Sequence, residues 1–73
     1  MSNAQLGRTI RIRLDDNYLT NVWLIEQLRK GGTIIDAARL SKILRGSIQG
    51  ALSGRILEES KKILDRYEFY FKD

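Results

Sequence analysis

Residues Thr33–Gly54, TIIDAARLSKILRGSIQGALSG, decide how the rest of the chain is interpreted. The spacing of apolar residues in this stretch predicts two short helices, residues 33–41 and 45–52, joined by a tight corner. Thr33 and Asp36 have the spacing of a capping box at the start of the first helix, with Asp in place of the preferred Glu. Packed against each other, the two helices leave one face that is polar and basic.

The packing between the two predicted helices depends on the size of their side chains. Ala37 and Ala38 stand where the first helix must approach the second closely, because larger side chains would hold the helices apart. Ile43 falls in the turn, where it fills the space between them. Three apolar residues are expected to anchor the second helix from beneath: Ile48, Ala51 and Leu52.

The positive charge of the chain is concentrated on the same stretch. The 73 residues include 13 Lys and Arg against 9 Asp and Glu, a net charge of +4. The segment from Arg29 to Arg55 holds six of the basic residues and a single acid, Asp36, so it carries +5 and the remainder of the chain carries −1. Such a local excess favours a polyanionic partner, because basic side chains release counterions from phosphates.

Two short helices with a tight corner and one basic face are typical of a helix-turn-helix, whose second helix enters the major groove of DNA. TIIDAARLSKILRGSIQGALSG resembles the N-terminal motif of lac-repressor-type proteins. In that resemblance Ala38 matches the small residue of the first helix, Ile43 the hydrophobic residue of the turn, and residues 47–49 the start of the recognition helix.

Two further likenesses support the same superfamily. AARLSKILRGSIQGAL is similar to the C-terminal motif of the factor for inversion stimulation, and LSGRILEESKKIL resembles the exit from the motif in lambda-repressor-like proteins. Together the resemblances imply a small bacterial or phage transcriptional regulator, for example a repressor of phage or plasmid origin.

The chain departs from this pattern at three positions. Lys42 stands where the turn normally has Gly, and a left-handed backbone there costs a Lys roughly 1 kcal/mol. Gly46 and Gly50 fall inside the predicted second helix, where each costs about 1 kcal/mol relative to Ala. These departures are compatible with a turn that is displaced by one residue, or shaped differently, relative to the standard motif.

The helix-turn-helix prediction assigns DNA contacts by position. Arg45, Ser47 and Gln49 begin the recognition helix and are expected to read base edges, since Arg suits guanine and Gln suits adenine. The flanking residues are expected to contact phosphates: Thr33, Arg39, Lys42 and Arg55.

An N-terminal strand is predicted ahead of these helices. Arg8–Leu14, RTIRIRL, alternates between polar and apolar residues, which is typical of a half-buried strand. Its partner is either the aromatic run Tyr67–Phe71 or the same strand of a second subunit. If two such strands pair in a dimer, an alternative is a ribbon-helix-helix protein that reads DNA with Thr9, Arg11 and Arg13.

The other predicted elements support this arrangement. A helix is expected from residues 15–17 to Lys30, ended by a left-handed cap at Gly31-Gly32, and an amphipathic supporting helix from Arg55 to Tyr67. Asp15-Asp16 is interpreted as a helix start and not as a catalytic pair. Residues 1–7 are expected to be disordered or vector-derived, because their first four resemble the remnant of an expression tag.

Composition limits the classes of function. With neither Cys nor His, the chain lacks the commonest metal ligands and the commonest general base, so we expect no metal, no cofactor and no enzymatic activity. No run of residues is apolar enough to span a membrane and no signal peptide is evident, so a cytoplasmic, nucleoid-associated location is expected. No small-molecule ligand is indicated.

The sequence thus predicts a mainly α, single domain over residues 1–73. It would contain about four helices, an N-terminal strand and a short C-terminal strand at residues 68–71. A homodimer on double-stranded DNA is expected, because the core is small and two recognition helices improve specificity. The alternative from another class is a protein-interaction module that uses its apolar faces and aromatic tail as an interface.

Overall fold

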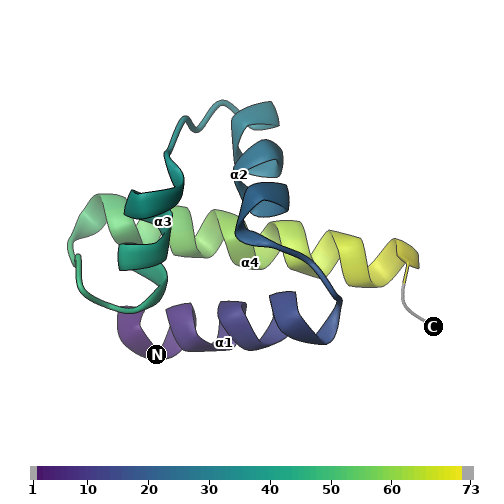
Figure 1. Ribbon diagram of the computed structural model, residues 1–73, viewed down its shortest axis with the longest axis horizontal. Coiled ribbons are helices and arrows are strands. Elements are labelled where there is room, and N and C mark those ends of the chain that lie inside the picture. The colour runs from purple at the N-terminus through teal and green to yellow at the C-terminus, as the bar shows by residue number, and fades with distance from the viewer. Residues whose placement is uncertain (1, 72–73) are drawn as a thin grey trace.

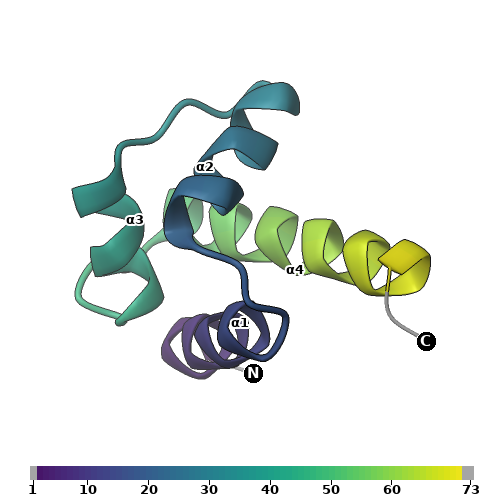
Figure 2. The same cartoon turned by 45° about the vertical axis from the view of Figure 1, so that its right-hand side comes forward.

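Four helices make up the part of the chain that the structure describes, residues 2–71. The computed structural model contains α1 (Asn3–Asp16), α2 (Asn21–Lys30), α3 (Ala37–Leu44) and α4 (Ala51–Phe71). α4 runs the length of the molecule, α1 lies along one side of it and α2 stands on the other, and α3 lies at one end, where it packs against the other three helices (Figures 1 and 2). The predicted mainly α class is confirmed, and none of these helices is long and apolar enough to cross a membrane.

All four helices contribute Leu and Ile side chains to one core. α1 buries a residue every fourth position, α2 buries two leucines, and α3 buries three residues within a single turn and a half. Burial of these side chains is the main favourable term that holds so short a chain together. The core consists of Leu6, Ile10, Leu14, Leu24, Leu28, Ile35, Leu40, Ile43, Leu44, Ile56, Leu57, Ile63 and Leu64.

The predicted strand over residues 8–14 is wrong, because this segment is the second half of α1. Leu6, Ile10 and Leu14 recur every four residues and are buried, whereas Ile12, which the strand pattern placed beside Ile10, is 51% exposed. The helical period therefore describes the buried face and the period of two does not. The ribbon-helix-helix alternative requires this strand, and between residues 2 and 71 the chain has none.

The start of α1 also corrects the expectation of disorder over residues 1–7, of which Met1 lies outside the described part. Ser2 is the N-cap: its hydroxyl accepts a hydrogen bond from the Gln5 amide, and the Gln5 side chain accepts one from the Ser2 amide. This reciprocal capping box satisfies two amides that a helix start leaves without partners. Ser2 and Gln5 thus begin the helix that the sequence pattern missed.

α4 is longer at both ends than the predicted supporting helix. The prediction of an amphipathic helix over residues 55–67 is confirmed, with Ile56, Leu57, Ile63 and Leu64 on its buried face. The helix begins at Ala51 and continues to Phe71, so the predicted C-terminal strand at residues 68–71 is wrong. The aromatic residues there have high strand propensity, but the helical period established upstream continues through them.

The first three helices each end in the same left-handed turn. In this Schellman motif, one amide after the helix donates to the carbonyl five residues back, and the preceding amide makes a shorter bond. Leu19 N–H donates to the Leu14 carbonyl at 2.8 Å, and Thr33 N–H donates to the Leu28 carbonyl at 2.9 Å. The left-handed residue of α2 is Gly32, with φ 97°, so the predicted Gly31-Gly32 cap is confirmed.

α1 and α2 are separate helices where one helix was expected to start at residues 15–17. Asp15 and Asp16 lie in the last turn of α1, and Tyr18 occupies the left-handed position of its Schellman motif with φ 58°. α2 then begins after Thr20, whose hydroxyl accepts from the Trp23 amide at 3.1 Å. The Tyr18 side chain is 95% exposed.

Neither predicted helix of the 33–54 stretch forms at its predicted position. The first runs over α3, residues 37–44, and the second does not form, because residues 45–50 are a loop before α4. Gly46 and Gly50 lie in this loop with φ 79° and 135°, and therefore do not weaken a helix. The three or four residues of a standard helix-turn-helix turn are replaced by the six of this loop.

The small and apolar residues of the stretch are redistributed accordingly. Ala37 and Ala38 are exposed and do not lie between two helices, and Leu52 is exposed as well. Ile43 is buried within α3 and not in a turn. Of the three predicted anchors only Ile48 packs against the core, from the loop.

Candidate nucleic-acid interface

α3 is a short helix fixed in place by its caps and by its buried side. Asp36 is its N-cap, and the carboxylate accepts a hydrogen bond from the Arg39 amide at 2.7 Å. Leu40, Ile43 and Leu44 are each no more than 1% exposed. An isolated helix of this length is unstable in water, so these core contacts are what hold α3 rigid and oriented.

The opposite side of α3 forms a continuous solvent-facing surface, which we call the outer face. Its cations are Arg39, Lys42 and Arg45, and all three are exposed. The same surface carries the small side chains of Ala37, Ala38 and Ser41, with Ala38 one turn before Lys42 and Ser41 one turn before Arg45. Small residues let a helix approach a ligand closely, while the three cations supply charge around the point of approach.

The end of α3 positions the other two predicted base readers. Gly46 takes the left-handed conformation, and Ser47 N–H donates to the Lys42 carbonyl at 2.9 Å, which closes a third Schellman motif. Ser47 and Gln49 therefore lie in an exposed loop and not on a recognition helix. The Gln49 side-chain amide donates to the Gly46 carbonyl at 3.4 Å, a long bond that keeps it beside the end of α3.

Glycine contacts bring the start of α1 and the start of α4 to this same end of the molecule. A Cβ on Gly7 would overlap the backbone carbonyl of Leu44, so α1 and α3 touch through their backbones. A Cβ on Gly46 would lie 3.1 Å from Ala4, and one on Gly54 would lie 3.6 Å from Asn3. Figure 1 shows the N-terminus, the end of α3 and the start of α4 gathered at one end.

Three arginines directly follow residues of these contacts. Arg8 follows Gly7, Arg45 follows Leu44 and Arg55 follows Gly54, and all three are exposed. Arg11, one helical turn after Gly7, lies on the same side of α1 and is exposed. We call this set the basic end; it consists of Arg8, Arg11, Arg39, Lys42, Arg45 and Arg55.

Arg8 is a member of the basic end that the sequence interpretation did not select. In the predicted strand it was only the first residue, with no assigned role. A helical interpretation places it one position after Gly7, which faces α3. Two features of the sequence therefore identify Arg8: the helical period of the apolar residues in α1, and the neighbouring Gly7, which marks a close contact between helices.

Arg13 is held away from the basic end by ion pairs. Its guanidinium donates to Asp65 at 2.8 Å and to Glu68 at 3.1 Å, and Asn17 donates to the same Glu68 oxygen at 2.9 Å. Partial burial acts to lower the pKa of Arg13, but the hydrogen bonds to Glu68 and Asp65 raise it overall. The structure therefore gives Arg13 the role of joining α1 to α4.

Thr33 is likewise engaged within the fold. It does not cap a helix; its hydroxyl donates to the Glu59 carboxylate at 2.9 Å, which ties the loop before α3 to α4. Glu59 lies one helical turn after Arg55, so this contact places Arg55 on the side of α4 that faces the start of α3. Of the nine residues predicted to contact DNA, seven are exposed: Arg11, Arg39, Lys42, Arg45, Ser47, Gln49 and Arg55.

Among residues 2–71, no group of three or more acidic side chains is placed so that it could hold a metal ion. Comparisons of the chain with protein-family models, with curated proteins and with solved structures found no match.

Proposed function

We propose that this protein binds double-stranded DNA through the outer face of α3, with the remaining cations of the basic end on the flanking phosphates. The observation that carries the proposal is the outer face itself. Three buried residues fix the helix in place. On its outer face, small side chains allow close approach of a ligand, and Arg39, Lys42 and Arg45 supply positive charge on the same face. The major groove of B-DNA is about 12 Å wide, which admits one helix of this kind.

Each contact in the proposal has a chemical role. Arg45 and Gln49 lie near the end of α3, where a guanidinium suits the guanine edge and a carboxamide suits the adenine edge. Lys42 and Arg39 on α3, with Arg55 on α4, neutralise phosphates and set the position of the helix along the duplex. Because residues 45–50 are a loop, the element that enters the groove is α3 and not the predicted helix at residues 45–52.

A small DNA-binding regulator of the bacterial or phage type is the biological role that fits this proposal. It includes a cytoplasmic, nucleoid-associated location and a homodimer, since two copies on adjacent half-sites raise specificity. The protein-interaction module remains the rival, and it differs in salt dependence. Binding to DNA by phosphate contacts weakens steeply as salt rises, whereas an apolar protein contact does not.

Fluorescence anisotropy of a labelled random duplex tests the proposal across a range of salt concentrations. The first variant combines Arg39→Ala, Lys42→Ala and Arg45→Ala. Its matched control combines Lys30→Ala, Lys61→Ala and Lys62→Ala, which removes the same charge from exposed positions on α2 and α4 outside the basic end. The first variant should reduce the slope of log affinity against log salt by about 2, since it removes the phosphate contacts of Arg39 and Lys42 and each contributes about 0.9.

Two results would overturn the proposal. One is no binding of the unaltered protein to any duplex at low salt. The other is equal loss of binding in the two triple variants, which would mean that net charge matters and the outer face of α3 does not.

A further inference from the structure

The last turns of α4 carry aromatic side chains that the core does not use. Phe69, Tyr70 and Phe71 are 80%, 73% and 75% exposed. Figure 1 shows this part of α4 extending past the end of α1, at the opposite end of the molecule from α3. We call this surface the aromatic end; it consists of Trp23, Tyr67, Phe69, Tyr70 and Phe71.

The rings of the aromatic end hold one another in place. Tyr67 contacts Trp23 edge to face at 5.3 Å between centroids and contacts Phe71 at 5.1 Å. Phe69 and Tyr70 make a second edge-to-face pair at 5.1 Å. Aromatic side chains have few rotatable bonds, and mutual contact restricts them further, so a partner that covers them loses little conformational entropy.

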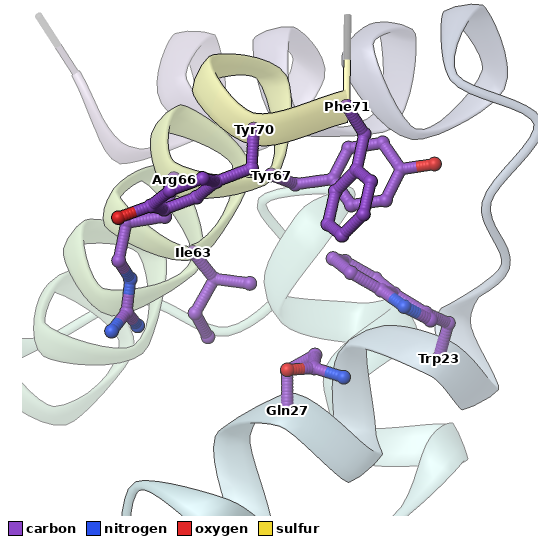
Figure 3. A pocket seen from close by; sticks show the side chains of 7 residues that line it. All are labelled: Trp23, Gln27, Ile63, Arg66, Tyr67, Tyr70 and Phe71. Atoms are coloured by element: carbon purple, nitrogen blue, oxygen red, sulfur yellow. The ribbon is translucent and has the colours of Figure 1, made fainter.

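A groove of about 460 Å³ lies next to the exposed rings, between α2 and α4. Trp23 and Gln27 line it from α2, and Tyr67, Tyr70 and Phe71 line it from α4 (Figure 3). Among its lining side chains Arg66 alone is charged. Aromatic residues and Arg, with few other charges, are the composition of the centre of a protein–protein interface.

We propose that the aromatic end binds a second copy of this chain about a two-fold axis. An interface of this symmetry requires one surface to be complementary to itself. The aromatic end meets that requirement because it presents a groove lined by the exposed Tyr70 and Phe71 and, outside the groove, the exposed ring of Phe69, which in this proposal enters the groove of the other copy. This inference does not rest on DNA binding, because the aromatic end and the basic end share no residue.

The exposed rings supply most of the area that such a dimer needs. An aromatic side chain offers 150–250 Å², so three rings about three-quarters exposed supply roughly 350–550 Å² per copy. The half-buried Trp23 and Tyr67 and the remaining groove add to this area. A specific interface buries at least about 600 Å² per partner, so the aromatic end supplies most of what a dimer at the lower size limit needs.

Sedimentation equilibrium of the full chain tests the inference, from micromolar to sub-millimolar concentration. The unaltered protein should dimerise reversibly, and sulfate should strengthen the dimer because it favours apolar burial. The variant Tyr70→Asp with Phe71→Asp should sediment as a monomer, since two carboxylates would have to be desolvated in the interface. Ile34→Asp is the matched control, because Ile34 is equally exposed, at 79%, but lies in the loop before α3.

Circular dichroism should give the same helix content for all three proteins, because the substituted side chains lie outside the core. A monomer at every concentration of the unaltered protein would overturn the inference. So would a dimer that survives Tyr70→Asp with Phe71→Asp, or one that Ile34→Asp dissociates. Since no DNA is present, failure of this experiment leaves the proposed DNA contact of α3 unaffected.

Discussion

Two glycines and one tyrosine occupy equivalent left-handed positions at the ends of α1, α2 and α3. Gly32 and Gly46 have φ of 97° and 79° and suit that conformation, whereas Tyr18 has φ 58° and carries a Cβ. A left-handed conformation costs a residue with a Cβ roughly 1–2 kcal/mol. Tyr18 is 95% exposed, so no packing contact in the folded chain offsets this strain.

The substitution Tyr18→Gly should therefore stabilise the protein. The relief of strain exceeds the extra freedom that Gly gives the unfolded chain, which leaves a net gain of about 0.5–1 kcal/mol and raises Tm by roughly 2–8 °C. Gly32→Ala should do the opposite, because its φ of 97° is strained for Ala although space around it is open. Thermal unfolding measures both, and a Tm lowered by Tyr18→Gly would contradict the assignment of Tyr18 to the cap.

Gly7 and Gly54 both lie within helices but have different surroundings. We therefore expect replacement by Ala to have opposite effects on stability at the two positions. Gly7→Ala should destabilise the protein by about 1–3 kcal/mol, because the new methyl group would overlap the Leu44 backbone. Gly54→Ala should stabilise it by up to about 1 kcal/mol, since the nearest atom is 3.6 Å away and Ala favours the helix. Urea unfolding measures both; equal effects would mean that α1 and α3 do not meet at Gly7.

At the scale of the elements, α1 is joined to the second half of α4 by the ion pairs of Arg13. The pKa of Asp65 is lowered, chiefly by the hydrogen bond from Arg13 and further by the one from Lys61. Because its folded pKa lies below the unfolded value near 3.8, this pairing stabilises the fold at higher pH and is lost as pH falls through the folded pKa.

The free energy of unfolding should accordingly decrease as the pH falls below 3.8, and Asp65→Asn should remove part of that decrease. The part removed should stay under about 1 kcal/mol, because the Asp65 side chain is 48% exposed and solvent screens the pair. Urea titrations across this pH range measure the change, with Glu58→Gln, an exposed carboxyl on the same helix, as the control. If the free energy of unfolding of Asp65→Asn decreases at low pH as much as that of the unaltered protein, the Arg13 pair contributes nothing to stability.

The success of the sequence prediction differed among elements for identifiable reasons. α4 was predicted because Ile56, Leu57, Ile63 and Leu64 keep a helical spacing over more than two turns. Residues 8–14 satisfy two periods at once, since Ile10 and Leu14 fit a strand and a helix equally well. The residues that decide for the helix, Leu6 and the Ser2 cap, lie in residues 1–7, which were expected to be disordered or vector-derived.

The candidate site was predictable in its charge but not in its geometry. The basic residues of the 33–54 stretch are exposed as expected, because charged side chains stay in water unless they find partners. The first helix was displaced because Asp36, and not Thr33, forms the cap. The ion pairs of Arg13 and the bond from Thr33 to Glu59 involve partners far along the chain, which no local pattern reveals.

At the scale of the whole molecule, the proposed DNA contact and the proposed dimer contact lie at opposite ends. The longest dimension is 34 Å, with α3 near one end and the last turns of α4 at the other. A dimer joined through the aromatic ends therefore keeps both outer faces free.

The most direct test of the central claim is an amide NMR titration of the ¹⁵N-labelled protein with a duplex at low salt. Contact through the outer face of α3 predicts shifts concentrated in residues 37–49, with smaller shifts around Arg8 and Arg55, and none at the aromatic end. Shifts centred on the aromatic end, or no shifts at a salt concentration low enough to favour phosphate contacts, would contradict the account.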